Sequence, residues 1–160
     1  MLLSGEVRQK YIATTSGIYS VHVAYTEGPD STSENLKVQQ YNVWKGLAGD
    51  DNWNTAGNWN CGFVPLGTDH IEIVEIKATS PIIAMGTSVF IYSLSLKADA
   101  QLKVDSGSTL TVTDVVEINA TANMVLEDEA SLVQINDVVN VGAVVVKKTT
   151  SPMKKFDFTY

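Results

Sequence analysis

The chain has 160 residues, of which 44% are hydrophobic and 18% are charged, a composition that suffices for a buried core and is unlike that of a disordered chain. Its net charge of −7 argues against nucleic acid as the main partner, because phosphate binding requires clustered Lys and Arg. No apolar run approaches the roughly 18 residues of a membrane span, and the single cysteine, Cys61, excludes an internal disulfide and a Cys-based zinc site.

The N-terminal quarter of the chain predicts a few β-strands. Residues 17–25, GIYSVHVAY, alternate between two faces as a strand does. Residues 27–31 contain Gly, Pro and Asp and predict a turn, residues 35–38 predict a second strand, and a weaker strand is expected near residues 8–14. Three strands are too few for a complete sandwich, which needs about seven. Residues 1–6 lack the basic and apolar regions of a signal peptide, so we expect the N-terminus to be a fragment boundary.

Residues 41–70 differ in composition from the preceding segment, because all three tryptophans lie there among Gly, Asn and Asp. Two interpretations of Trp44, Trp53 and Trp59 are open. Exposed rings could stack on sugars, as in carbohydrate-binding modules. Alternatively, the rings seal the open end of a β-solenoid, which would otherwise expose apolar core and unpaired strand edges. Three tryptophans that bury on the order of 200 Å² each would make a substantial cap.

The same segment contains the spacing Asp50-x-Asn52-x-Asn54, which is similar to the start of a calcium-binding loop. The sixth position is Thr55, where an EF-hand needs Gly, and the twelfth is Cys61, where it needs Glu. The segment is therefore not an EF-hand. Because Asp and Asn also form turns readily, a structural turn is the main interpretation and a weak calcium site is the alternative.

From position 71 onward the chain is a succession of short strands, and its most informative feature is a repeat with a period of about 22 residues. Leu94 aligns with Val116, and Leu102 aligns with Met124 at the same spacing. That spacing also relates further apolar side chains, namely Leu96 with Ile118, Val104 with Leu126 and Leu110 with Leu132. Three short apolar pairs in each period, separated by turns, predict one coil of a parallel β-helix whose coils stack about 4.8 Å apart.

This repeat sets expectations for the whole C-terminal region. Leu102 should stack directly on Met124 in the next coil. Eight side chains of the repeat should point inward, namely Leu94, Leu96, Leu102, Val104, Val116, Ile118, Met124 and Leu126. We expect residues 71–74 and 89–91 to form an irregular first coil, and residues 144–146 to continue a looser one after the repeat. An antiparallel sandwich with a coincidental repeat is the competing interpretation.

The C-terminal end combines basic and aromatic residues after a stretch, between Val104 and Val146, that contains no Lys or Arg. The last aromatics alternate with Asp157 and Thr159, so they share one face of a strand. We expect this edge to pair with another segment and the neighbouring lysines to orient an acidic partner. The residues concerned are Lys147, Lys148, Lys154, Lys155, Phe156, Phe158 and Tyr160.

Three stretches of the sequence resemble known bacterial surface proteins. The text TTSGIYSVHVAY followed by SENLKV is similar to the last strands of bacterial immunoglobulin-like modules. The block DDNWNTAGNWNCGFVPLGTDHIEIV, then QLKVDSGSTLTV, then TTSPMKKFDFTY resembles a region of large adhesins of gliding bacteria that are exported by the type IX secretion route. In those proteins the last segment continues into Trp-Ser-Ser-Pro, whereas this sequence stops at Tyr160. The resemblance implies a surface location, a structural or adhesive role and no catalytic residues.

The predicted fold is therefore all-β, with a short right-handed parallel β-helix preceded by strands of a partial immunoglobulin-like sandwich. The expected boundaries are 1–40 for the partial sandwich, 41–70 for the Trp-rich capping segment, 71–148 for the solenoid and 149–160 for a strand leading to an absent downstream domain. The sequence contains no Gly-x-Ser-x-Gly, His-Glu-x-x-His or phosphate-binding loop.

From these features we expect a non-catalytic structural or adhesive segment of a secreted or cell-surface protein, without a cofactor or a transmembrane segment. A carbohydrate-binding module that uses the tryptophans is the alternative function. The expected partners are other domains of the parent protein or a secretion or outer-membrane component, with glycans under the alternative and no nucleic acid.

Overall fold

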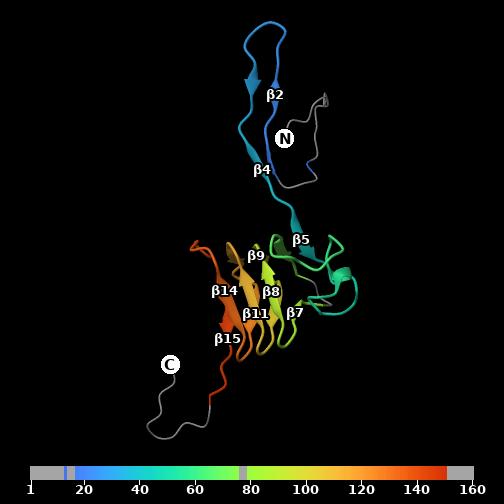
Figure 1. Ribbon diagram of the computed structural model, residues 1–160, viewed down its shortest axis with the longest axis vertical. Coiled ribbons are helices and arrows are strands. Elements are labelled where there is room, and N and C mark those ends of the chain that lie inside the picture. The colour runs from blue at the N-terminus through green and yellow to red at the C-terminus, as the bar shows by residue number, and fades with distance from the viewer. Residues whose placement is uncertain (1–12, 14–16, 76–78, 151–160) are drawn as a thin grey trace. The chain divides into compact units, whose positions relative to one another are not determined.

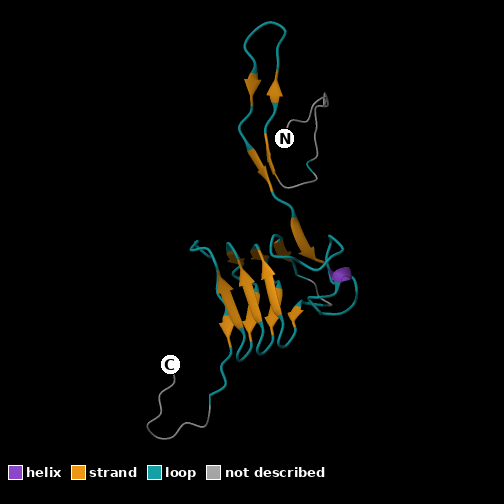
Figure 2. Ribbon diagram, viewed as in Figure 1, coloured by secondary structure: helices purple, strands orange, loops and turns teal. Residues whose placement is uncertain are grey.

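The computed structural model describes residue 13 and residues 17–75 and 79–150 (Figures 1 and 2). The chain divides into two compact units, Met1–Gln40 and Tyr41–Tyr160. The described part of the chain is almost entirely strand and loop, with one short 3-10 helix, η1, at Ala56–Asn58. No helix in the described part is long and apolar enough to cross a membrane. The predicted all-β class is confirmed.

The first unit contains two short antiparallel strand pairs. Strand β1 (Gly17–Tyr19) pairs with β4 (Leu36–Val38), and β2 (His22–Val23) pairs with β3 (Ser31–Thr32). The long alternating run therefore forms two strands rather than one. The strand expected near residues 8–14 falls almost entirely outside the described residues, and membership of an immunoglobulin-like sandwich remains a prediction.

The second unit is a parallel β-solenoid with three sheets, which confirms the predicted architecture (Figure 2). Sheet 1 consists of β5 (Tyr41–Trp44), β6 (His70–Ile73), β9 (Ser93–Leu96) and β12 (Val116–Ile118). Sheet 2 consists of β7 (Ile82–Ile83), β10 (Gln101–Val104), β13 (Asn123–Leu126) and β15 (Val145–Val146). Sheet 3 consists of β8 (Ser88–Ile91), β11 (Thr109–Val112) and β14 (Ser131–Gln134). Every strand pair within these sheets is parallel.

The register of the second and third coils follows the sequence repeat. Leu102 pairs with Met124, as predicted, and the same offset holds in the other two sheets, where Leu94 pairs with Val116 and Leu110 with Leu132. The neighbouring coils depart from it. The offset from the first coil to the second is 23 in sheet 1 (His70 to Ser93) and 21 in sheets 2 and 3, and the last strand follows at 20 (Val125 to Val145). The turns that connect the strands therefore differ in length at both ends of the stack.

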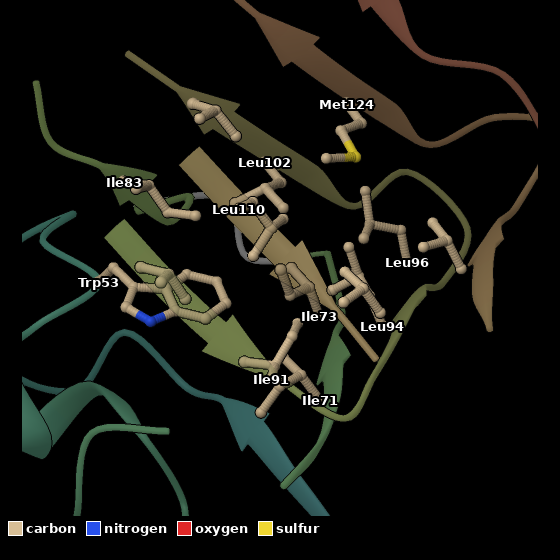
Figure 3. Close-up of a cluster of buried hydrophobic side chains, with 14 of the residues drawn as sticks. Trp53, Ile71, Ile73, Ile83, Ile91, Leu94, Leu96, Leu102, Leu110 and Met124 are labelled. Carbon is tan, nitrogen blue, oxygen red and sulfur yellow. The ribbon is translucent and has the colours of Figure 1, made fainter. Parts of the chain in front are cut away.

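The core consists of columns of side chains that stack from coil to coil (Figure 3). All eight residues predicted to point inward are buried, namely Leu94, Leu96, Leu102, Val104, Val116, Ile118, Met124 and Leu126. Burial of each such side chain contributes about 1.5–3 kcal/mol as an upper estimate. A single coil could not bury these residues, so the stack folds as a unit.

A tight turn joins sheet 2 to sheet 3 in every coil. In the second coil, the carbonyl oxygen of Asp105 accepts a hydrogen bond from the N–H of Ser108 at 3.1 Å. The third residue of the turn has a positive φ, which favours glycine. The three residues at this position are Gly86 (72°), Gly107 (67°) and Glu129 (63°). The third coil therefore places a glutamate where the backbone suits glycine.

Candidate functional site

The tryptophans form a compact cluster at the N-terminal end of the solenoid. Trp44, Trp53 and Trp59 are 0%, 1% and 3% exposed, respectively. Trp59 meets the other two rings edge to face, with centroids 5.2 Å from Trp44 and 4.7 Å from Trp53. Its Nε1–H donates to the carbonyl oxygen of Trp53 at 2.8 Å, while Nε1–H of Trp44 donates to the carbonyl oxygen of Thr79 at 3.2 Å.

This burial decides between the two interpretations of the tryptophans. A sugar ring stacks on an aromatic face that is open to solvent, and none of the three indoles offers one. The rings instead join the same core cluster as Ile71 and Ile83 of the first coil, and Trp53 lies beside that coil in Figure 3. The expectation that Trp53 and Trp59 are buried is confirmed, and the burial favours the capping interpretation over stacking on sugars.

The capping segment also covers the outer edge of the first strand, β5. Trp59 forms an antiparallel bridge with Trp44, and the N–H of Asn60 donates to the carbonyl oxygen of Val43 at 2.9 Å. In return, the Asn60 side-chain oxygen accepts from the N–H of Val43 at 2.6 Å. In sheet 2, the N–H of Trp53 donates to the carbonyl oxygen of Ile82 at 3.1 Å. The cap therefore satisfies backbone groups that an open sheet edge would expose.

Asn58 holds the capping loop together. Its side chain is fully buried, and Nδ2 donates to a carboxylate oxygen of Asp50 at 2.6 Å, while Oδ1 accepts from the N–H of Ala48 at 2.9 Å. Its carbonyl oxygen accepts hydrogen bonds from the backbone N–H groups of Lys45 and Gly46 at 2.6 and 3.2 Å. A buried amide with this many partners fixes one loop conformation.

The calcium candidates Asp50, Asn52 and Asn54 lie in this loop as turn residues. The Asp50 carboxylate accepts from the N–H of Asn52, and the Asn52 side-chain oxygen accepts from the N–H of Asn54, both at 3.0 Å. Desolvation raises the pKa of Asp50, but hydrogen bonds from Asn52, Asn58 and Thr55 outweigh it and hold the pKa below its ordinary value. These oxygens serve the turn, and the described residues contain no group of three or more His, Cys, Asp and Glu that could hold a metal ion.

A groove of 810 Å³ runs along the outer face of sheet 2. Its floor carries the outward side chains of β10 and β13, including Gln101 and Asn123, which are neighbours in register. The lining also contains Lys103, Glu127 and Lys147. None of the described residues that line the groove is aromatic. The groove presents amide and charged groups to a ligand but no stacking surface.

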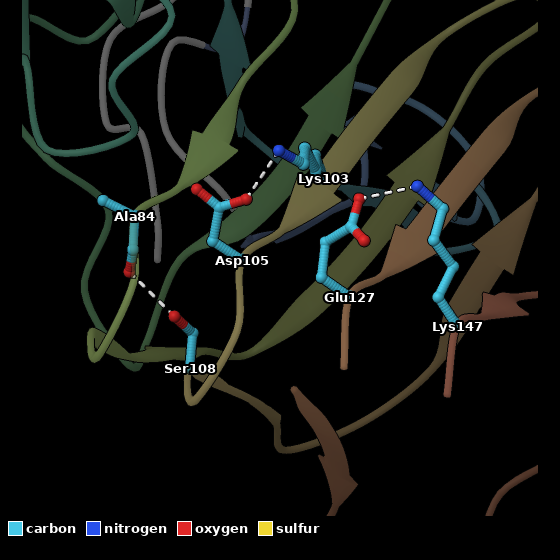
Figure 4. A network of polar contacts seen from close by, with 6 residues as sticks. All are labelled: Ala84, Lys103, Asp105, Ser108, Glu127 and Lys147. Atoms are coloured by element: carbon cyan, nitrogen blue, oxygen red, sulfur yellow. Dashed lines mark hydrogen bonds and ion pairs between the residues drawn. The ribbon is translucent and has the colours of Figure 1, made fainter. Parts of the chain in front are cut away.

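Two ion pairs lie beside this groove (Figure 4). Lys103 Nζ lies 2.7 Å from a carboxylate oxygen of Asp105, and Lys147 Nζ lies 2.7 Å from one of Glu127. The hydrogen bond to Asp105 is the main cause that raises the pKa of Lys103, so this lysine remains charged. Because Asp105 and Glu127 occupy equivalent positions in successive coils, the two lysines offset the repulsion between stacked carboxylates.

The structure brings together one pair of chemically interesting side chains that the sequence analysis missed. His70 Nδ1 lies 2.7 Å from Ser93 Oγ, and the His70 ring packs edge to face between Tyr41 and Tyr92 at 5.9 and 4.6 Å. Ser93 is only 4% exposed, so its hydroxyl is not presented to a substrate as a nucleophile must be. We interpret the pair as a hydrogen bond that joins β6 to β9.

A comparison with protein-family models finds one match, over residues 43–160, to a domain of unknown function, DUF8693. The match covers well over half of the chain. The chain belongs to the DUF8693 family. No curated protein and no solved structure matches the chain.

The region matched by the DUF8693 model begins within β5 and includes the tryptophan cap, the solenoid and residues 149–160. The first strand pairs of the chain, β1 to β4, lie outside it. The cap and the solenoid are therefore parts of one family domain, as their shared core also indicates.

Within the described residues, the C-terminal end of the solenoid has no cluster of buried aromatic side chains like that of the cap. Valines remain exposed there, including Val138, Val139, Val145 and Val146. Of the predicted partner residues, Lys147 already pairs with Glu127, and Lys148 is exposed. The remaining ones, Lys154, Lys155, Phe156, Phe158 and Tyr160, lie outside the described residues, so their role at a partner edge remains a prediction.

Cys61 lies half-buried at the end of the capping segment. Desolvation, together with the negative charge of Asp69, raises the pKa of its thiol. The thiolate is the reactive form of cysteine, so this environment disfavours nucleophilic chemistry. This arrangement suits a packing role for the Cys61 side chain.

Proposed function

We propose that this DUF8693 chain is a non-catalytic structural segment of a secreted or cell-surface protein, located on the exterior of the outer membrane. The observation that carries the proposal is the solenoid capped at its N-terminal end by the tryptophan cluster. Its first strand, β5, begins at Tyr41, shortly after β4 ends at Val38. A strand placed this close to a preceding β-unit and capped by its own loop suits a module that stands in series with other domains.

The resemblance to adhesins of gliding bacteria supports the same assignment, because it places a similar order of segments in exported surface proteins. Under this proposal the partners are other domains of the parent protein or a secretion or outer-membrane component. The aromatic residues Phe156, Phe158 and Tyr160 would provide the apolar contacts, since alternating aromatics form one continuous strand face.

Labelling of intact cells tests the location. Antibodies raised against residues 41–150 should bind unpermeabilised cells of the source organism, and external protease should release the epitope while a cytoplasmic marker stays intact. Labelling that appears only after permeabilisation would overturn the surface assignment. Deletion of the segment from the parent protein should impair attachment of cells to surfaces without loss of a metabolic activity.

The groove on sheet 2 favours a second candidate, namely binding of a polar chain such as a glycan. Gln101 and Asn123 present amides from adjacent strands, a spacing suited to hydroxyl groups along an extended ligand. A glycan array should show binding that the double variant Gln101→Ala, Asn123→Ala abolishes. The matched control Lys97→Ala lies at the corner after sheet 1 and should bind normally. An array without any hit removes this candidate.

A further inference from the structure

One turn of the solenoid contains an Asn-x-Thr sequence, the acceptor pattern of N-linked glycosylation. Asn119, Ala120 and Thr121 directly follow β12, in the turn that leads from sheet 1 to sheet 2. No other asparagine of the chain is followed two positions later by Ser or Thr. Because the pattern is short, its placement in the structure decides whether it can act as an acceptor.

The side-chain nitrogen of Asn119 is available for reaction. All three residues of the acceptor sequence are exposed. The Asn119 Oδ1 atom accepts from the backbone N–H of Thr121 at 3.1 Å and from the Thr121 hydroxyl at 3.2 Å. A backbone N–H can only donate, so this contact identifies Oδ1 as the amide atom that faces the turn. Among the described residues, no hydrogen bond engages Nδ2 of Asn119.

The backbone of this turn does not require an asparagine. The N–H of Ala122 donates to the carbonyl oxygen of Asn119 at 2.9 Å. In the preceding coil, the equivalent bond joins the N–H of Ala100 to the carbonyl oxygen of Lys97 at 3.1 Å. The same turn therefore closes with a lysine in place of Asn119. The asparagine and the threonine two positions later are thus an additional feature of the third coil and not a condition of the fold.

A carboxylate lies two residues before the acceptor. Glu117 is exposed on β12, between the buried side chains of Val116 and Ile118. An arginine can pair with such a carboxylate through two hydrogen bonds, which fixes orientation as well as adding attraction. An enzyme that modifies Asn119 would therefore find an exposed carboxylate on one side of the amide and an exposed hydroxyl on the other.

We propose that Asn119 is a site of N-linked glycosylation. The donor is an oligosaccharide joined through a diphosphate to a membrane lipid. Asn119 Nδ2 forms a bond to the anomeric carbon of the first sugar, and the bond from that carbon to the phosphate oxygen breaks. The lipid diphosphate leaves, and the proton lost from Nδ2 passes to a base of the transferase. This inference rests on the proposed function, because the transfer takes place outside the cytoplasm.

Mass spectrometry of the parent protein, purified from cells of the source organism, tests the inference. Because no Lys or Arg lies between Val104 and Val146, trypsin releases the site in one fragment, residues 104–147. We expect this fragment to have the added mass of an oligosaccharide, and sequencing of the fragment in the spectrometer should locate that mass on Asn119.

Variants of the acceptor sequence sharpen the test. Asn119→Gln and Thr121→Val should abolish the modification. Thr121→Ser should retain it, because serine keeps the hydroxyl, which also accepts from the N–H of Asp99 at 3.1 Å. Glu117→Gln should lower the modified fraction severalfold. Asn123→Gln is the matched control and should leave the modification unchanged, since Asn123 is an exposed asparagine of the same fragment outside the acceptor sequence.

The outcomes separate this inference from the proposed function. An unmodified fragment 104–147, from protein that antibody labelling locates at the cell surface, would overturn the inference and leave the proposed function intact. Labelling only after permeabilisation, together with an unmodified fragment, would overturn both. Sugar that remains on the fragment of Asn119→Gln would also overturn the inference, because a Ser or Thr hydroxyl would then carry it.

Discussion

The two ends of the solenoid both have to keep strand edges and apolar columns from water, and they use different side chains to do so. The N-terminal end has three buried tryptophans and an asparagine-centred loop that covers the edge of β5. Among the described residues, the C-terminal end has no buried aromatic side chain, and Val139 is 86% exposed. In the described part of the chain, large buried rings thus fill the last layer at one end of the stack, whereas exposed aliphatic side chains lie at the other.

The tryptophan cap should account for the largest single contribution at either end. We expect Trp59→Ala to cost about 3–5 kcal/mol, because it removes a large buried aromatic and the contacts of its two neighbours. Urea denaturation followed by far-UV circular dichroism measures this. Val139→Ala at the opposite end serves as the control and should change stability by less than about 0.5 kcal/mol. Equal effects at the two sites would contradict the difference between the ends.

Asn58, at the polar centre of the cap, should make the next largest contribution to stability. Asn58→Ala leaves the N–H of Ala48 without its side-chain acceptor and removes one of the hydrogen bonds to the Asp50 carboxylate, so we expect a cost of about 2 kcal/mol. Asn54→Ala, at an exposed position of the same loop, is the control and should cost little. Thermal melting of both variants provides the comparison. A stable Asn58→Ala protein would show that the indole rings alone maintain the cap.

The turn between sheets 2 and 3 offers a substitution that should stabilise the C-terminal side. Glu129 has a positive φ of 63° where the equivalent turns have Gly86 and Gly107. Glu129→Gly relieves this strain, and we expect a gain of about 0.5–1 kcal/mol after allowance for the greater freedom of glycine in the unfolded chain. The reverse exchange, Gly107→Ala, should destabilise by a similar amount. A shift of the two urea midpoints in the same direction would contradict this reasoning.

Acid should weaken the capping loop through Asp50, with the smallest of these effects. The folded-state pKa of Asp50 is below its ordinary value, so the carboxylate contributes stability that is present above the unfolded pKa of about 3.9 and is lost as pH falls through the folded pKa. Melting temperatures measured between about pH 5 and pH 2, a window set by these values, should fall less steeply for Asp50→Asn than for the unmodified protein. Parallel curves would show that Asp50 does not contribute.

The sequence repeat was enough to predict the parallel stack and the pairing of Leu102 with Met124. Turns of constant length give one constant sequence offset between paired residues of successive coils. The same reasoning could not predict the offsets of 23, 21 and 20 in the flanking coils, which depend on irregular corners. The pair formed by His70 and Ser93 lies at one of these offsets. Aligning the first coil with the second at this longer offset would have revealed the pair.

The cap was predicted only in outline. The clustering of tryptophans beside the repeat indicated a lid, yet nothing local showed that Asn60 would bond to Val43 or that Asn58 would be fully buried. Those contacts join residues 10 to 17 positions apart through turns. Asn and Asp in a sequence indicate a turn without specifying which distant backbone group the side chain will meet.

The edge-to-face stack of Trp44, Trp53 and Trp59 has an optical consequence. All tryptophans of the chain belong to this stack, and indoles packed this closely at steep angles couple as chromophores. Intrinsic tryptophan emission will therefore report on the N-terminal end of the solenoid. Local opening around β14 and β15 will leave this emission unchanged.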